Sequence, residues 1–378
     1  MGRFLDRGND DFVSARNSEY VDKSAMIQYI NETLVTENRF SCVSRCRRFG
    51  KSLAAKMLYA YYDRASDSRH LFEDLAIAKM PSYETHLNRY PTIFVDMTEF
   101  TTEYGKNSDV VDIMQTTIKK EVCELYPDVT IDESDNLMST LFKVTDKTGD
   151  RFIMIIDEWD AICREFDSVS GVMDKYVDWL RTMFKSDATS KVFLGVYMTG
   201  IMPIKRYNTN SALSNFYDSS VIDPGIFAHD FGFTEEETMS LAKKHSLDVK
   251  ELKNWYEGYK IGNEPTMYNP DSVMRVINGQ QYTLHWYGTS AYNSDIAPFM
   301  NDNFDGVKDY VTQILAGNKC KAVIGNDINN MVNFQTKDDV LALLVHLGYL
   351  SYDANTKTCF VPNEEVRNTL YNAVNYIY

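Results

Sequence analysis

The segment "SRCRRFGKSLAAKML", residues 44–58, decides the fold class of this chain. It ends like a phosphate-binding loop, because Gly50, Lys51 and Ser52 lead directly into a run of helix-forming residues. The usual pattern of such a loop is G-x-x-x-x-G-K-[ST], and here Arg45 stands in place of the first glycine. The segment is therefore either a variant nucleotide site or a chance G-K-S sequence before a helix.

Composition sets the broad class. The chain has 378 residues, of which 44% are hydrophobic, so it can bury the cores of two or three domains. Its formal net charge of -15 argues against broad electrostatic attraction to nucleic acids, which proteins bind mainly through lysine and arginine. No apolar run reaches the roughly 18 residues of a membrane helix, and the start, "MGRFLDRGNDDF", lacks the apolar segment of a secretory signal. We therefore expect a cytoplasmic globular protein.

The cysteines and histidines give no metal or disulfide pattern. The six cysteines contain no C-x-x-C pair, and the six histidines lack the spacing of metal ligands. Cys42 and Cys46 flank the glycine loop, where redox control through a thiol is one hypothesis. The simpler hypothesis is that both are small residues packed near a tight turn.

One basic cluster stands out against the acidic composition, and it consists of Arg45, Arg47, Arg48 and Lys51. Charge clusters are often solvated faces without a ligand. A basic cluster beside a glycine turn at a strand-to-helix junction nevertheless suits an anion, because backbone N–H groups and the helix N-terminus point to the same place.

Apolar strands and amphipathic helices alternate through the first half of the chain. Strands are expected at residues 39–44, 90–97, 151–158 and 191–200, and helices at residues 51–65, 108–126 and 171–185. This alternation indicates an α/β fold of three layers, in which helices cover both faces of a parallel sheet. Ligands of such sheets bind at the carboxyl ends of the strands.

Polar side chains follow each expected strand. The first strand leads into the glycine loop, and the others end in Asp96, in Asp157 with Glu158, and in Thr199. A phosphate loop, carboxylates and a hydroxyl are the groups that a magnesium-bound triphosphate requires. The acidic pair that ends "IMIIDE" therefore favours a nucleotide site over a chance G-K-S sequence. The loss of the first glycine leaves the lysine, the serine and the second glycine in place.

Several longer motifs resemble those of the bacterial AAA-ATPase-like family. They are "YVDKS", "SRCRRFGKSLAAKMLYAYYD", "MIIDEWD", "YMTGIMPIKRYNTNSALSNF", "FGFTEEE", "WYEGYKIG", "YNPDSV", "VLALLVHLGYL" and "FVPNEEVR". The resemblance runs over nearly the whole chain. The family's loop usually reads R-P-R-R-F-G-K-S, so an arginine in place of the first glycine is a family trait, and Cys46 here replaces the proline.

The resemblance implies a P-loop NTPase fold of the additional-strand type, in which the strand ending at Thr199 lies between the loop strand and the Asp157 strand. It implies that Lys51 contacts the β- and γ-phosphates of ATP and that Ser52 and Asp157 hold Mg²⁺. Glu158 then polarises the attacking water, and Thr199 is the polar sensor of the γ-phosphate.

The expected nucleotide-binding residues are Arg45, Cys46, Arg47, Arg48, Phe49, Gly50, Lys51, Ser52 and Leu53, with Tyr20 upstream. Tyr20 would stack on the adenine and Asp22 would orient the loop, although an aromatic residue before a helix also suits the core. Arg47 and Arg48 either line the phosphates or meet a neighbouring subunit or domain.

Three further residues are candidates near the same site. Arg206, with Lys205 beside it, follows the strand that ends at Thr199 and is a candidate catalytic contact to the γ-phosphate. Asp160 belongs to the D-E-x-D signature, and capping a helix is an equally good hypothesis for it.

The character of the sequence changes near residue 230. We expect an ATPase-like domain at residues 1–229 and a mostly helical, winged-helix-like lid domain at residues 230–378. "GFTEEETMSLAKKHS" has the threonine cap and the glutamate-rich first turn of a helix. "DDVLALLVHLGYLSYDANTKTCFVP" predicts a helix followed by a two-stranded hairpin, as in winged-helix-like modules. Such modules bind DNA or a protein partner, and the acidic residues make DNA the less favoured partner here.

Two functions remain open. In the first, the chain is a Mg²⁺-dependent ATPase whose nucleotide state switches a protein partner or effector. In the second, bound nucleotide gates an interaction with little or no turnover, for example in nucleic-acid processing or defence. Glu158 favours the first, since a pure binding module has no need of such a residue.

Members of the family commonly continue into a restriction-endonuclease-like nuclease domain. The acidic and lysine motif of that domain is not found in this sequence, so we expect ATPase activity but no nuclease activity from residues 1–378. The final stretch instead predicts a helix whose Tyr371, Tyr376 and Tyr378 could pack onto the lid.

Overall fold

The structure is a computed structural model that describes residues 2–105, 109–166, 171–204, 213–279, 281–285, 297–325 and 334–375. The chain divides into two compact units. The α/β unit contains Met1–Val43, Lys51–Gly200 and Asn208–Asp218, and the C-terminal unit contains Ser44–Gly50, Ile201–Tyr207 and Ser219–Tyr378. The sequence placed one boundary after residue 229, whereas the last segment of the C-terminal unit begins at Ser219.

The α/β unit is built on a sheet with the strand order β2-β3-β4-β1-β5. The strands are β1 (Phe40–Ser44), β2 (Thr92–Asp96), β3 (Phe152–Asp157), β4 (Phe193–Gly200) and β5 (Tyr217–Ser219). β3 pairs in parallel with both β2 and β4, and it is buried along its whole length, as its apolar sequence predicts. The four predicted strands are confirmed, and β4 lies between β1 and β3, as the additional-strand type of P-loop fold requires.

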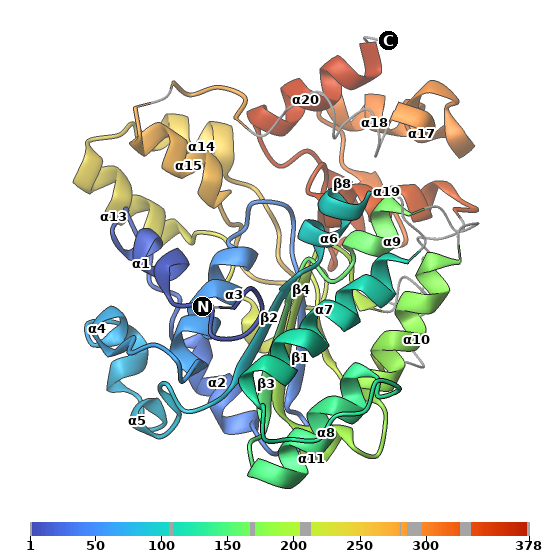
Figure 1. The fold of residues 1–378 in the computed structure, drawn as a ribbon. Helices are drawn as coiled ribbons and strands as arrows, with labels where there is room; N and C mark the ends of the chain where they lie inside the picture. The colour runs from blue at the N-terminus through green and yellow to red at the C-terminus, as the bar shows by residue number, and fades with distance from the viewer. Residues whose placement is uncertain are drawn as a thin grey trace. The chain divides into compact units, whose positions relative to one another are not determined.

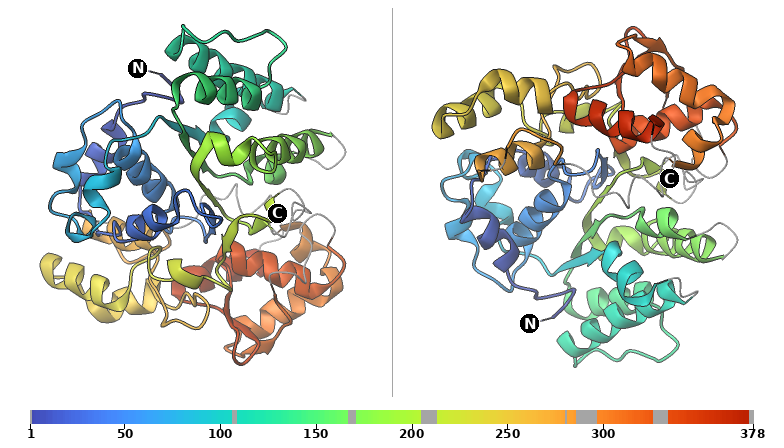
Figure 2. Two further views of the ribbon diagram at one scale, coloured as in Figure 1. Left: turned by 90° about the horizontal axis from the view of Figure 1, so that it is seen from below. Right: turned by 90° about the horizontal axis from the view of Figure 1, so that it is seen from above.

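Helices cover both faces of this sheet (Figures 1 and 2). The larger ones are α2 (Met26–Thr33), α3 (Lys51–Tyr62), α7 (Val110–Leu125), α8 (Leu137–Thr148) and α10 (Val172–Phe184). In Figure 2 the blue helices of the first part of the chain lie on one side of the strands and the green helices on the other. The three predicted helices correspond to α3, α7 and α10 and are confirmed.

Several short helices were not predicted, because they are too short to show a repeating apolar pattern. They are α1 (Asp10–Arg16), α4 (Arg69–Phe72), the 3-10 helix η1 (Ala76–Lys79), α5 (Tyr83–His86), α6 (Met97–Tyr104), α9 (Ala161–Glu165) and α11 (Thr189–Val192). Two of them matter for the site described below, since α6 follows β2 and α9 follows β3.

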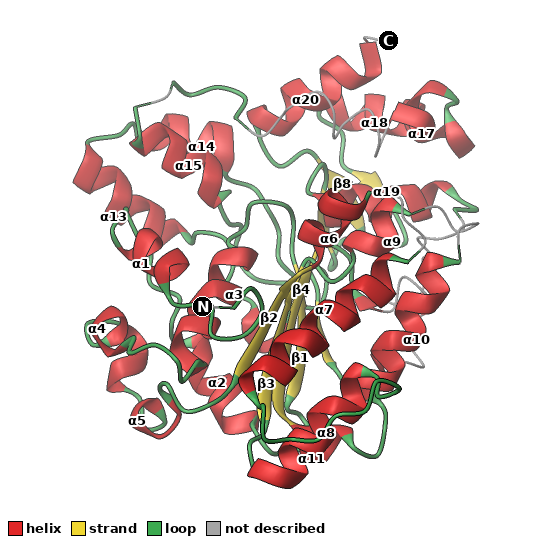
Figure 3. Cartoon of the chain, in the orientation of Figure 1, coloured by secondary structure: helices red, strands yellow, loops and turns green. Residues whose placement is uncertain are grey.

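The C-terminal unit is mostly helical (Figure 3). α13 (Glu235–His245) begins at the predicted threonine cap, where Thr234 and Glu237 form a capping box. α19 (Lys337–Leu347) leads into an antiparallel hairpin of β7 (Ser351–Asp353) and β8 (Thr358–Phe360), which confirms the predicted helix and hairpin. The unpredicted β6 (Cys320–Lys321) pairs with β8 as a third strand.

The remaining described elements of this unit are α14 (Val249–Tyr256), α15 (Pro270–Ile277), α17 (Ala297–Asn301), α18 (Val307–Leu315) and α20 (Glu364–Asn375), with the 3-10 helices η4 (Gly225–Phe227) and η5 (Phe304–Gly306). Tyr371 on α20 is 56% exposed. Tyr376 and Tyr378 lie outside the described residues. Among the described helices, none is long and apolar enough to cross a membrane.

The end of α3 yields a prediction about pH. Asp63 follows α3 and is 1% exposed, and burial, assisted by the negative charge of Asp6, raises its pKa from 3.8 to about 6. The folded protein therefore holds this proton more tightly than the unfolded chain. The free energy of unfolding falls as pH rises from 3.8 through about 6. Between about pH 4 and pH 7.5, the free energy of unfolding of Asp63→Asn should therefore rise by about 2–3 kcal/mol relative to that of the unmodified chain.

The measurement is urea unfolding of both proteins at the two pH values. The substitution itself can change the free energy of unfolding by an amount that does not depend on pH. Comparing how this free energy changes with pH in the two proteins removes that constant amount. The exposed Asp67, changed to asparagine, is the matched control. A difference between Asp63→Asn and the unmodified chain that stays the same at both pH values would contradict the prediction.

Candidate functional site

The first part of the site is the start of α3. Gly50 has a backbone φ of +87°, which glycine adopts without strain. A residue with a side chain would rarely adopt this φ. Lys51 and Ser52 then form the first turn of α3. The Lys51 side chain is only 4% exposed, so its ammonium group is held inside the protein near the end of the sheet.

Asp157 ends β3 and is 2% exposed. Its carboxylate accepts a hydrogen bond from the Thr199 hydroxyl at the end of β4, and the Ser52 side chain hydrogen-bonds to the same carboxylate. Burial, together with the negative charge of neighbouring Glu158, raises the pKa of Asp157 to about 6, against the two hydroxyl hydrogen bonds. The sequence prediction that these three residues meet at one place therefore agrees with the geometry.

The backbone after β3 is held in an unusual conformation. Glu158 has φ of +50°, in the left-handed region that costs a non-glycine residue about 1–2 kcal/mol. The next residue anchors it, because the backbone N–H of Trp159 donates to the carbonyl of Thr199 at 2.8 Å and the Trp159 carbonyl accepts from the Tyr176 hydroxyl at 2.8 Å. Gly200 is required beside it, since a Cβ there would lie 2.6 Å from the Trp159 ring.

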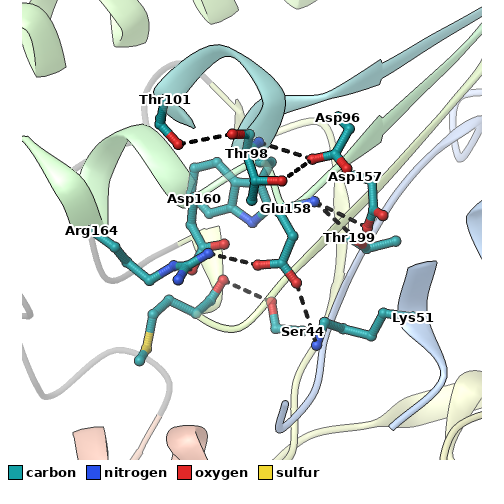
Figure 4. Close-up of polar contacts among 12 residues, drawn as sticks. Ser44, Lys51, Asp96, Thr98, Thr101, Asp157, Glu158, Asp160, Arg164 and Thr199 are labelled. Carbon is teal, nitrogen blue, oxygen red and sulfur yellow. Dashed lines mark hydrogen bonds and ion pairs between the residues drawn. The ribbon is translucent and has the colours of Figure 1, made fainter. Parts of the chain in front are cut away.

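The Glu158 side chain lies between two cations (Figure 4). One carboxylate oxygen is 3.8 Å from the Lys51 ammonium nitrogen, and the other is 2.6 Å from a guanidinium nitrogen of Arg164 on α9. Arg164 is in turn 3.2 Å from a carboxylate oxygen of the fully buried Asp160. Asp160 occupies the N-cap position of α9 but makes no side-chain capping bond, so its side chain serves the arginine instead.

Asp96 ends β2 and is the register partner of Asp157 on β3. Its carboxylate caps α6, because it accepts hydrogen bonds from the backbone N–H of Thr98 at 2.9 Å and from the Thr98 hydroxyl at 2.6 Å (Figure 4). The two strand-end carboxylates are thus neighbours, as the parallel sheet predicts, but Asp96 has a structural partner of its own.

The residues before Gly50 belong to the C-terminal unit and pack within it. The Arg45 guanidinium is fully buried and donates to the carbonyls of Ser44, Ser219 and Phe227 at 2.9, 3.0 and 2.9 Å. The arginine in place of the first glycine therefore fills the protein interior with its side chain. Phe49 is also buried, where its ring meets Tyr259 edge to face at 5.0 Å.

The other arginines of the basic cluster have different surroundings. Arg48 has φ of +67° and its guanidinium is 2.6 Å from a carboxylate oxygen of Asp271 on α15. Arg47 is partly exposed, and Leu53 on α3 is exposed by 37%. Cys46 is buried and its thiol contacts the Val345 carbonyl at 3.7 Å. Cys42 is buried as well, which favours packing over a redox role for both cysteines.

Tyr20 is partly buried, and its ring packs edge to face on Phe12 and lies 5.1 Å from the Arg16 guanidinium. Burial raises the pKa of its hydroxyl. Asp22 accepts hydrogen bonds from the backbone N–H groups of Ser24 and Ala76 at 2.8 and 2.7 Å, so it fixes local backbone. The candidates Lys205 and Arg206 lie outside the described residues.

The donor set of the site fits a magnesium ion. The Asp157 carboxylate and the Ser52 hydroxyl are hard oxygen ligands, and they already contact each other. Within the part of the chain that the structure describes, no group of three or more His, Cys, Asp and Glu side chains could hold a metal. One carboxylate and one hydroxyl would suit Mg²⁺ only if the ion took its other ligands from phosphates and water, as it commonly does.

Arg164 is the site residue that the sequence interpretation missed. Its four-residue spacing from Asp160 on a helix is the signal that could have identified it, because such a pair shares one helix face. That signal was weak, since the helix α9 was itself too short to be predicted.

Comparison with known proteins gives one family and several distant structures. The family model described as predicted AAA-ATPase matches residues 8–209. A Walker-type ATPase of Pyrococcus abyssi has 14% identity and a TM-score of 0.47, with 93% of this chain and 96% of that chain covered. CDC6P from Pyrobaculum aerophilum has 11% identity and a TM-score of 0.33, with 98% and 97% covered. No curated protein sequence matches this chain.

Proposed function

We propose that this chain, which belongs to the predicted AAA-ATPase family, binds ATP with Mg²⁺ and hydrolyses it. The observation that carries the proposal is the meeting of a buried lysine at the start of α3 with a buried aspartate and a glutamate at the carboxyl end of β3. Positioning and charge are what phosphoryl transfer to water demands of a protein. The gathering of these side chains supplies both.

Lys51 would bind the β- and γ-phosphates, because its ammonium is the cation at the start of α3 and the helix N-terminus also favours anions. The Lys51 ammonium nitrogen lies 3.8 Å from a Glu158 carboxylate oxygen, a distance beyond that of a hydrogen bond.

Ser52 and Asp157 would hold Mg²⁺, which when bound neutralises charge on the β- and γ-phosphates. Thr199 keeps the Asp157 carboxylate oriented through its hydroxyl and is suited to sense the γ-phosphate from the end of β4. Glu158 would accept a hydrogen bond from the attacking water and take up its proton, as general bases do. Arg206 remains the candidate for a further γ-phosphate contact.

The nucleotide state would then switch a partner or an attached effector, with a protein partner favoured over DNA because the chain carries a net charge of -15. We propose that this activity takes place in the cytoplasm. The second candidate function is a nucleotide-gated interaction module with little turnover. The observation that favours it is the pairing of Glu158 with two cations, which restrains the base.

Measured release of phosphate from ATP by the purified chain, with and without Mg²⁺, separates the two functions. Mg²⁺-dependent turnover that Glu158→Gln removes supports the ATPase. Tight ATP binding with no turnover in the unmodified chain supports the gated module. If ATP does not bind at all, the proposed site is wrong.

We expect no tight Mg²⁺ binding in the absence of nucleotide. One carboxylate and one hydroxyl are too few ligands for an ion that demands octahedral geometry and keeps several waters. Titration calorimetry should show a Kd for Mg²⁺ alone of about 1 mM or weaker, and much tighter binding when ATP is present. Micromolar affinity for Mg²⁺ without ATP would contradict this, and Asp157→Asn is the control that identifies the ligand.

A further inference from the structure

The two cations beside Glu158 do not hold it equally. The 2.6 Å distance to Arg164 is that of a charge-assisted hydrogen bond, whereas the 3.8 Å distance to Lys51 is that of an ion pair without a hydrogen bond. Figure 4 shows the two cations on opposite sides of the Glu158 carboxylate. Arg164 is therefore the stronger of the two partners.

Arg164 is itself held in place by Asp160. Its Nε lies 3.2 Å from Asp160, which has no exposure to solvent, while its Nη2 lies against Glu158. Asp160 is confined further, because a Cβ on Gly200 would come within 2.7 Å of its carboxylate. One planar guanidinium thus bridges the buried carboxylate of Asp160 and the carboxylate of Glu158 through two different nitrogens.

The contact of Arg164 with both Asp160 and Glu158 would matter more once a triphosphate is bound. Asp157, Glu158 and Asp160 place three carboxylates within four residues, and a triphosphate adds more negative charge. Lys51 would then turn to the phosphates, and the Glu158 carboxylate would lose one of its two cations. Arg164, anchored to Asp160, is the cation that stays.

We propose that Arg164 is a positioning residue for the proposed ATPase reaction, in which it holds the carboxylate of Glu158 toward the attacking water while Lys51 binds the phosphates. This inference rests on the proposed function. Arg164 touches neither ATP nor water in this role, and it acts through Glu158 alone.

The test compares steady-state ATP hydrolysis by the unmodified chain, Arg164→Gln and Arg164→Lys. Because a small misplacement of a catalytic group costs much in rate, kcat should fall about 10- to 100-fold in Arg164→Gln and less in Arg164→Lys, with KM for ATP within about twofold. Arg181, whose exposed side chain pairs with Asp178 on α10, is the matched control, and Arg181→Gln should leave kcat and KM unchanged. Thermal unfolding checks that each variant is folded, and Arg164→Lys carries the test if Arg164→Gln is not.

A double-mutant cycle separates positioning from a general structural role. In a Glu158→Gln background, Arg164→Gln should cause no further loss of the residual rate, since its effect passes through Glu158. The inference is overturned if both losses add in full, if kcat is unchanged or raised in the single variants, or if only KM changes. An unmodified chain without turnover would instead overturn the proposed function, and the inference with it.

Discussion

Lys51→Ala should weaken ATP binding by about 30-fold or more. Its side chain is 4% exposed at the start of α3, so a phosphate contact there would be shielded from water. Removing one partner of a buried charge pair typically costs about 2–5 kcal/mol, and each 1.4 kcal/mol is a tenfold change in affinity. Alanine should not unfold the protein, because Glu158 keeps its closer partner Arg164.

Titration of a fluorescent ATP analogue, or calorimetry with ATP and Mg²⁺, measures this effect. Lys56, one turn along the same helix and paired with Asp11 at 3.5 Å, is the matched control. Lys56→Ala should bind ATP as the unmodified chain does. Equal affinity of Lys51→Ala and the unmodified chain would show that the G-K-S sequence is not a phosphate-binding loop.

Glu158→Gln should retain ATP binding and lose turnover. The amide has nearly the same shape and can still accept the hydrogen bond from Arg164 through its oxygen, but it cannot take up a proton from water. General-base catalysis contributes about 100- to 10,000-fold, so kcat should fall by that order while the Kd for ATP stays within about threefold.

Phosphate release and equilibrium binding are measured on the same preparation. Glu165→Gln is the matched control, because Glu165 is an exposed glutamate on α9, next to Arg164. Its turnover should equal that of the unmodified chain. Retained turnover in Glu158→Gln would mean that another group activates the water, and a large loss of ATP affinity would mean that Glu158 has a role in binding.

The sequence could predict the strand-end residues because a parallel sheet brings the carboxyl ends of its strands to one edge. Asp157, Thr199 and Ser52 meet as that rule requires, although 147 residues separate Ser52 from Thr199 in the chain. A run of five or six apolar residues is a strong signal of a buried strand. The order of the strands was predicted from the family resemblance and not from this signal.

The contacts of single side chains could not be predicted in the same way. Arg164 reaches Glu158 only because the chain turns sharply after β3, with φ of +50° at Glu158 and the Trp159 ring packed under Gly200. Neither feature has a periodic signal. Arg45 was assigned to a basic cluster because its neighbours in sequence are basic, whereas its acceptors lie at Ser219 and Phe227.

The buried position of Arg45 has a consequence for dissecting the protein. A guanidinium remains charged at any accessible pH, and an unpaired charge inside a protein costs several kcal/mol. A truncation after Asp218 would remove the Ser219 and Phe227 carbonyls that Arg45 donates to, although it spares every strand from β1 to β4. The end of β5 and the peptide that follows it are thus part of what holds the arginine that stands in place of the first glycine.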